Sequence, residues 1–236
     1  MIHLGGVRLL FDAGDGLSSS YKATGCGYDA VDRVFLSHMH SDHVGGFSLF
    51  VQGLWLEKRR RGLPVHLPGL AVPAIQAWLR ATVLFDQLLG FPLYWEPLAK
   101  NVPIREGGVT IVPFPTTHLE SLRKAFQKRQ PSTCFEAFCF VIEGHGKRLA
   151  YTADIGHVDD LDPLLAQPLD LLVCEASHVP LNELLAKLAG RSIGRLVFTH
   201  LERELWNNPE LFQAAAQAAL GDLPFVIARD GDVFTF

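Results

Sequence analysis

Short apolar runs alternate along this chain with polar turns and with longer segments of helical spacing. Runs such as 34–36, between Arg33 and Ser37, and 171–174, between Asp170 and Glu175, are short and bounded by polar residues, as expected of buried strands. The pattern predicts extended segments at 7–11, 34–36, 63–68, 109–112, 135–143, 148–152, 169–174, 195–198, 225–228 and 233–236, the last two forming a closing hairpin. It predicts helices at 50–61, 72–89, 159–166, 181–189 and 209–220. Strands that alternate with helices indicate an α/β protein.

Five of the apolar runs are followed closely by residues of the types that bind metals. Strand ends at one edge of a layered sheet can bring their loops together at one site. His3, His66 and His157 lack this placement and are predicted to be surface or structural residues, and His145 to be a turn residue. The residues that follow the five runs are His38, His118, Asp154, the pair Glu175 and His178, and His200.

The stretch from His38 to His43 has the spacing H-x-H-x-D-H and lies between a predicted strand and a helix start. Side chains two positions apart in an extended loop can point the same way, so His38 and His40 could bind one metal ion. Asp42 and His43 could bind a second ion nearby. Imidazole and carboxylate suit Zn²⁺, with Fe²⁺ or Mn²⁺ as alternatives. A merely solvated loop is the alternative, but this spacing favours a metal site.

Asp12 directly follows the predicted strand 7–11 and precedes a Gly-bearing turn. It could accept a hydrogen bond from the second ring nitrogen of a ligand histidine and so fix that ring. It could equally be an ordinary turn aspartate, and the sequence favours neither interpretation.

Length and composition limit the classes that need to be considered. At 236 residues the chain is predicted to be one domain, residues 1–236. A net charge of -4 gives no global attraction to nucleic acid. No signal peptide and no membrane span is predicted, and the four cysteines lack paired-metal spacing, so we expect a cytoplasmic protein with reduced thiols. The apolar content of 48% and the aromatic residues at 91–95 are compatible with a homodimer.

Two short basic segments could contact phosphates. The run 58–61 consists of four basic residues, and 123–129 contains four more. Such a run is more often the solvated end of a helix, where it complements the helix dipole.

The ordered set of motifs resembles the metallo-β-lactamase superfamily, and within it the ribonuclease Z-like branch of phosphodiesterases. The likeness spans nearly the whole chain. The residues that carry it are the H-x-H-x-D-H stretch, Leu10-Phe11-Asp12-Ala13-Gly14, His118, Asp154 after Tyr151-Thr152-Ala153, Glu175-Ala176-Ser177, His200 after Phe198-Thr199, and Ala228-Arg229-Asp230-Gly231.

The resemblance implies a four-layer αββα sandwich with a dinuclear metal site at one edge. By motif position, His38, His40 and His118 would bind the first metal ion, and Asp42, His43 and His200 the second. Asp154 would bridge the two ions, which are expected to be zinc, with manganese or iron as alternatives.

Two departures from the family pattern affect what is expected. The family has an extra strand and a Gly-containing turn before the 11–12 region. Here we expect that strand to be missing, either because this sheet edge is altered or because the chain begins late. The chain also lacks a long insertion of the kind that grips transfer RNA, so tRNA 3′ processing is not favoured.

The predicted function is a metal-dependent hydrolase in which a bridging hydroxide attacks a small-molecule or nucleotide-type phosphodiester. Asp42, His178 and Glu175 are the candidate catalytic residues, with His178 donating a proton to the leaving oxygen and Glu175 orienting it. The same site could hydrolyse a carboxylic ester, thioester or lactone. A third alternative is a non-enzymatic scaffold, against which the complete ligand set argues.

Overall fold

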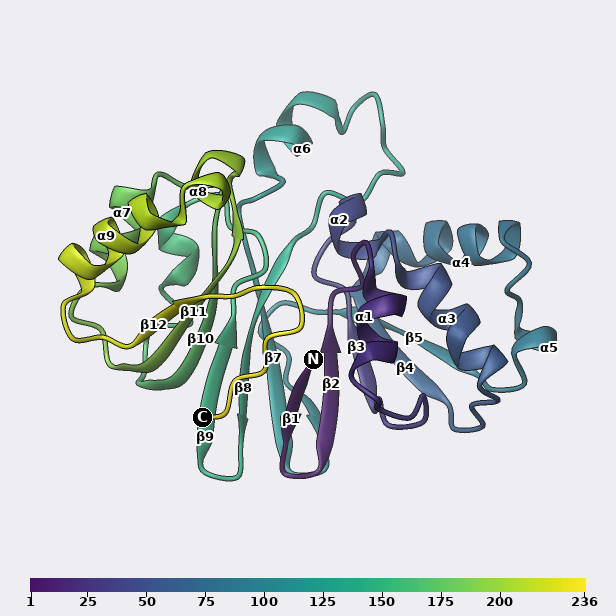
Figure 1. Ribbon diagram of the computed structural model, residues 1–236. Helices are drawn as coiled ribbons and strands as arrows, with labels where there is room; N and C mark the ends of the chain where they lie inside the picture. Colours follow the sequence, from purple (N-terminus) through teal and green to yellow (C-terminus); the bar gives the residue numbers. More distant parts are fainter. The chain divides into compact units, whose positions relative to one another are not determined.

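The computed structural model describes all residues from 1 to 236. It divides into two compact units, one formed by Met1–Val102 with Leu122–Ala137 and the other by Pro103–Ser121 with Phe138–Phe236. Each unit has one sheet, its own helices and its own buried core (Figure 1). No helix of the chain combines the length and the apolar composition that crossing a bilayer requires.

The first unit contains a five-stranded sheet in the order β1-β2-β3-β4-β5. The strands β2 to β5 are parallel, and β1 is antiparallel to β2. Because β2, β3 and β4 carry apolar residues at successive positions, they can be buried on both faces, as parallel strands usually are. The strands are β1 (Ile2–Leu4), β2 (Val7–Phe11), β3 (Arg33–Phe35), β4 (Leu63–Pro68) and β5 (Leu93–Leu98).

The strand β1 corrects the expectation that this edge of the sheet would lack a strand. Ile2–Leu4 pairs with β2, and His3 lies opposite Arg8. The connecting turn is Gly5-Gly6, and both glycines have positive φ values, of 56° and 88°. Only glycine adopts such conformations without a steric cost, so the tight turn depends on this pair.

The helices of the first unit lie beside β2 to β5 (Figure 1). Phe47, Phe50 and Leu54 of α3 are fully buried, and the Phe50 ring packs edge-on to Tyr21 of α1. The predicted helix over 72–89 is wrong in one respect: α4 ends at Ala81, Val83 has a φ of 64°, and α5 begins at Asp86. The elements are α1 (Leu17–Ala23), α2 (Ser41–Val44), α3 (Phe47–Leu56), η1 (Gly69–Ala71), α4 (Val72–Ala81) and α5 (Asp86–Leu89).

The basic run 58–61 is not a simple solvated helix end. The helix α3 ends before it, and Lys58 takes a left-handed φ of 59° that turns the chain. The next side chain, Arg59, is only 1% exposed and donates hydrogen bonds to four backbone carbonyls. Arg61 pairs with Asp32 at 2.6 Å. These arginines therefore tie loops together within the first unit.

His66 has the structural role predicted for it. It is buried on β4, its ring stacks on Phe35 with centroids 4.6 Å apart, and Arg33 lies 2.9 Å from its Nε2. Burial, followed by the nearby Arg33 charge, lowers the pKa of His66 to about 3. The ring is therefore neutral near pH 7 and its Nε2 can accept the Arg33 hydrogen bond.

The second unit contains a seven-stranded sheet in the order β12-β11-β10-β9-β8-β7-β6. The strands β9 to β12 are parallel and β6 to β9 are antiparallel. The C-terminal ends of β9, β10 and β11 therefore lie at one edge. The strands are β6 (Ile104–Glu106), β7 (Val109–Pro115), β8 (Phe138–Gly144), β9 (Lys147–Tyr151), β10 (Leu169–Ala176), β11 (Ile193–Leu201) and β12 (Phe225–Ile227).

The helices α7 and α9 lie beside β10 to β12 (Figure 1). Phe212 of α9 packs edge-on to Phe198 of β11, with centroids 4.7 Å apart. The predicted closing hairpin is wrong, because β12 pairs in parallel with β11 and residues 233–236 form no strand. The remaining elements of this unit are η2 (Val158–Leu161), α7 (Leu181–Leu188), α8 (Arg203–Asn207) and α9 (Pro209–Leu220). The helix α6 (Glu120–Phe126) begins in this unit, and from Leu122 on it belongs to the first.

Candidate functional site

In the first unit, the loop after β3 gathers three imidazole rings. His38 is fully buried, and its ring centroid lies 4.8 Å from that of His40 and 4.1 Å from that of His43. Asp42 Oδ2 lies 3.7 Å from His43 Nε2. The four residues of the H-x-H-x-D-H stretch are thus together, because His40 ends an extended segment and the short helix α2 turns the chain back immediately after it.

Asp12 fixes the orientation of these rings through its two carboxylate oxygens. Its Oδ2 lies 2.8 Å from His43 Nδ1, and its Oδ1 accepts from the Ser37 backbone N–H at 2.7 Å. Ser37 Oγ donates to Asp12 Oδ2 at 3.0 Å and lies 3.0 Å from His38 Nδ1. These contacts engage the Nδ1 atoms of His38 and His43, which leaves their Nε2 atoms for a ligand. Ser37 was not among the predicted site residues, although it directly precedes His38.

The turn after β2 packs so closely against α2 that it needs a glycine. Ala13 N–H donates to the His43 carbonyl at 2.7 Å, and Gly46 N–H donates to the Ala13 carbonyl at 2.8 Å. A Cβ atom on Gly14 would overlap the backbone carbonyl of Asp42. The Gly-bearing turn therefore positions the loop that carries the four donors.

Replacing Gly14 by alanine is expected to lower the free energy of unfolding by about 1–3 kcal/mol, because backbone atoms must shift to admit the methyl group. Thermal unfolding measures the effect. Gly27→Ala is the matched control, since a Cβ at Gly27 meets no atom within 4 Å. Equal unfolding temperatures for the two variants would contradict the close approach.

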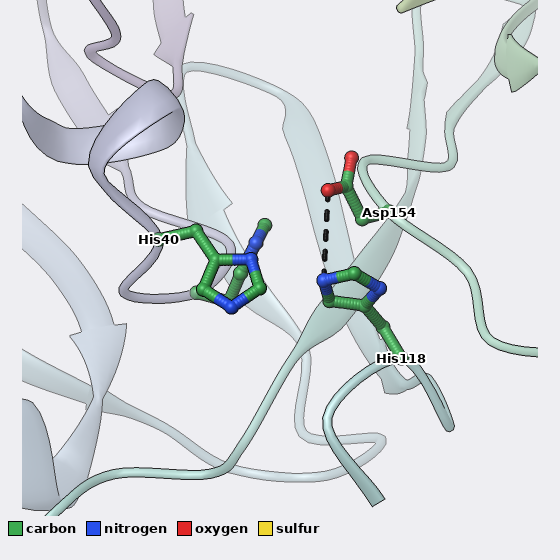
Figure 2. Close-up of side chains that lie close together, drawn as sticks. His40, His118 and Asp154 are labelled. Carbon is green, nitrogen blue, oxygen red and sulfur yellow. Dashed lines mark ion pairs between the residues drawn. The ribbon is translucent and has the colours of Figure 1, made fainter. Parts of the chain in front are cut away.

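In the second unit, Asp154 lies at the centre of three histidines. Its side chain is 1% exposed, and its Oδ2 lies 3.6 Å from His118 Nε2, 3.7 Å from His178 Nδ1 and 3.9 Å from His200 Nε2. Figure 2 shows the ion pair between His118 and Asp154. Asp154 follows β9, His178 follows β10 and His200 lies near the end of β11, so the parallel strands bring these residues to one edge, as predicted.

Glu175 holds His178 in place. Both carboxylate oxygens lie 3.1 Å from His178 Nδ1, and the carboxylate also accepts backbone hydrogen bonds from Ile155, Ser177 and His178. An acceptor at Nδ1 favours a proton on that nitrogen, so Nε2 is the atom that could face a substrate or an ion.

Left-handed backbone conformations occur at or beside the predicted site residues. Asp12, Ala153 and His200 have φ values of 56°, 46° and 50°. Residues other than glycine adopt this region at a cost, and such conformations are concentrated at functional sites. The backbone at His200 and before Asp154 is therefore held in place by its surroundings.

The cysteines take no part in these clusters. None of the four forms a disulfide. Burial raises the pKa of the Cys139 and Cys174 thiols, and raises that of Cys134 to about 11. These three thiols are therefore protonated near neutral pH and are poor nucleophiles.

The donors in each unit fit a divalent metal ion. Imidazole nitrogens accompanied by a carboxylate are ligands that zinc binds in both structural and catalytic sites, and they also suit iron and manganese. Glu175, His178 and His200 have ligand atoms within 4.8 Å of one another. The residues predicted as ligands gather as His38, His40, Asp42 and His43 in the first unit and as His118, Asp154 and His200 in the second.

The chain is similar to known proteins along most of its length. The model of the beta-lactamase superfamily domain matches residues 7–201. The ribonuclease Z of Bradyrhizobium sp. (strain ORS 278) is 25% identical over 250 residues, which cover 85% of this chain and 82% of that protein.

Two solved structures resemble the chain in fold. The metallo-beta-lactamase fold protein YhfI from Bacillus subtilis has a TM-score of 0.74 at 20% identity, covering 98% of this chain and 88% of that one. The short form of human tRNase Z has a TM-score of 0.67 at 16% identity, covering 99% and 90%. These similarities confirm the predicted fold class, a mixed α/β architecture with two sheets.

Proposed function

This chain belongs to the beta-lactamase superfamily. On that basis we propose that it is a metal-dependent hydrolase that cleaves phosphodiesters. The relative from Bradyrhizobium, which the chain matches over most of both lengths, is named a ribonuclease Z. The substrate class we propose is accordingly a small-molecule or nucleotide-type phosphodiester.

The observation that carries this proposal is the cluster around Asp154. A buried carboxylate with three imidazole nitrogens 3.6–3.9 Å from one of its oxygens is a costly arrangement unless the carboxylate interacts with positive charge. A divalent cation supplies that charge, and a carboxylate can bind two such ions through its two oxygens. The role proposed for Asp154 is the bridging ligand.

The ligand assignment follows the order of the family's motifs. We assign His38, His40 and His118 to one ion and Asp42, His43 and His200 to another. Zinc, manganese or iron held by these residues would supply Lewis-acid chemistry, lowering the pKa of a coordinated water towards neutral and offsetting charge on the phosphoryl oxygens.

The protein's own groups have distinct proposed tasks. The contacts of Asp12 and Ser37 hold His43 and His38 with their Nε2 atoms directed away from the supporting residues. His178, with its Nδ1 proton held by Glu175, would act as the imidazolium and would donate the second proton, on Nε2, to the leaving oxygen as the phosphorus–oxygen bond breaks. Asp42, which is exposed, is proposed both as a ligand and as a group that faces the substrate.

Replacing His178 by alanine is expected to leave the metal content unchanged and to lower turnover on the order of 10²-fold, because a general acid contributes at least that much. Metal analysis and steady-state kinetics with bis-p-nitrophenyl phosphate measure the two effects. His3→Ala, at an exposed position on β1, is the control. If turnover is unchanged in His178→Ala, the proton-donor role is wrong.

A substrate panel tests the proposed reaction itself. The purified chain, supplied with zinc or manganese, is assayed with bis-p-nitrophenyl phosphate, p-nitrophenyl acetate and a simple lactone. Turnover of the phosphodiester alone supports the proposal. Turnover of the ester or lactone alone would assign the site to carbonyl chemistry, and no turnover together with no bound metal would indicate a non-enzymatic scaffold.

A further inference from the structure

A buried carboxylate outside the predicted motifs links two of the loops that carry predicted ligands. Asp160 lies on η2 and is 8% exposed. Its Oδ2 accepts hydrogen bonds from Thr117 N at 3.0 Å, Thr117 Oγ1 at 2.9 Å, Gly156 N at 2.9 Å and His157 N at 3.2 Å. A buried charge is tolerated only when hydrogen bonds replace its lost hydration, and these four donors do so.

The donors belong to two different loops. Thr117 directly precedes His118 in the loop after β7, and Gly156 follows Asp154 by two positions in the loop after β9. A further hydrogen bond joins the same two loops: Thr116 Oγ1 donates to the Asp154 carbonyl at 2.9 Å. The side chains of His118 and Asp154 are 3.6 Å apart, so a small shift of either loop alters their spacing.

The two loops touch at a glycine. A Cβ atom built on Gly156 would lie 2.5 Å from the carbonyl carbon of Thr117 and 2.6 Å from its Oγ1. No side chain fits between the loops, so Asp160 acts on backbone segments that are already in direct contact.

The 3₁₀-helix η2, which carries Asp160, is also held by ion pairs with α7. Lys187 of α7 lies 2.8 Å from Asp159 Oδ1 and 2.7 Å from Asp162 Oδ1. His157 caps η2 by accepting from Asp159 N at 3.2 Å. Asp160 is therefore fixed by a helix that carries none of the predicted ligands.

We propose that Asp160 is a positioning residue for metal binding, which holds the loops of His118 and Asp154 at the spacing that a shared ion requires. The inference rests on the proposed function, since it assumes that these two residues bind metal. Asp160 contacts neither ligand side chain and acts through Thr117 and Gly156. Partners that orient metal ligands in this indirect way affect metal affinity about 10- to 100-fold in other proteins.

The test compares metal binding by Asp160→Asn with that of the unchanged chain. Asparagine keeps the size of the side chain, but it replaces the charged acceptor and places an amide N–H₂ among four donors. Zinc affinity is measured by competition with a chromogenic chelator, and the site is loaded with Co²⁺ so that its visible absorption spectrum reports the ligand geometry. We expect about 10- to 100-fold weaker zinc binding and an altered cobalt spectrum.

Asp170→Asn is the matched control. Asp170 also holds two segments together, accepting from Lys147 Nζ and from Arg148 N, both at 2.9 Å, but it does so at the start of β9 and β10, at the opposite end of these strands from the ligands. Its replacement is expected to lower the unfolding temperature while zinc affinity and the cobalt spectrum stay unchanged.

The outcomes separate the inference from the proposed function. If the unchanged chain binds metal and Asp160→Asn binds it equally well, the positioning role is wrong and the proposed function stands. If the unchanged chain binds no metal, the proposed function and the inference both fall. Should Asp160→Asn not fold, Thr117→Val removes one of the four hydrogen bonds while keeping the side-chain shape, and unchanged zinc affinity in that variant would overturn the inference.

Discussion

Replacing Asp154 by alanine is expected to lower hydrolysis of bis-p-nitrophenyl phosphate on the order of 10³-fold, a loss typical of removing one group that stabilises charge in a transition state. The expected loss is large because the carboxylate is buried among His118, His178 and His200 and is proposed to bridge two ions. Metal content should fall together with activity, which distinguishes this variant from His178→Ala.

Elemental analysis of the purified variant, alongside steady-state kinetics, measures both effects. Asp222→Ala is the control, because that residue is exposed in the turn between α9 and β12, away from the predicted ligands. Retention of two metal ions per chain by Asp154→Ala would rule out the bridging assignment.

Replacing Arg59 by alanine is expected to lower the free energy of unfolding by about 3–5 kcal/mol. Its guanidinium donates to the carbonyls of Tyr28 at 2.7 Å, Val31 at 3.0 Å, Arg61 at 2.7 Å and Gly62 at 3.1 Å. Hydrogen bonds from a charged donor each contribute about 1.5–3 kcal/mol, and the carbonyls left buried without a donor add a desolvation cost. The side chain also fills space in a packed region.

Thermal or denaturant unfolding measures this loss, which corresponds to a fall in unfolding temperature of roughly 10 °C for a chain of this size. Arg60→Ala, at the exposed neighbouring position, should change stability by no more than about 0.5 kcal/mol. Arg59→Lys tests the geometry, because an ammonium group cannot reach four carbonyls in the plane of a guanidinium fork. Stability of Arg59→Ala equal to that of Arg60→Ala would contradict the role assigned to Arg59.

The sequence predicted the elements best where local pattern and tertiary context agree. The strands β7 to β11 and the helices α7 and α9 lie where apolar periodicity placed them, to within a few residues. The break at Val83 was missed because nothing in the local spacing marks a β-branched residue with a φ of 64°. The hairpin predicted for the C-terminus is wrong because β12 pairs with β11, which is distant in sequence.

The same limit applies to the basic run. Four consecutive basic residues look alike in sequence, yet Arg59 is buried and Arg60 is exposed. The difference arises where Lys58 turns the chain and directs one guanidinium towards the carbonyls of the 28–31 segment. Only the folded chain brings that segment close.

The sequence by itself determined which side chains have the chemistry of metal ligands, because that chemistry belongs to the side chain and the H-x-H-x-D-H spacing is local. It also placed Asp154, His178 and His200 at strand ends, since the C-terminal ends of parallel strands share an edge. Only the tertiary structure decided what holds these residues. The supports are Ser37 with Asp12, Glu175 with the backbone of Ile155, Ser177 and His178, and Asp160 with Thr117 and Gly156. The bonds from Ser37 to Asp12, from Ile155 to Glu175 and from Thr117 to Asp160 span 25, 20 and 43 positions, and no local pattern encodes a hydrogen bond of that span.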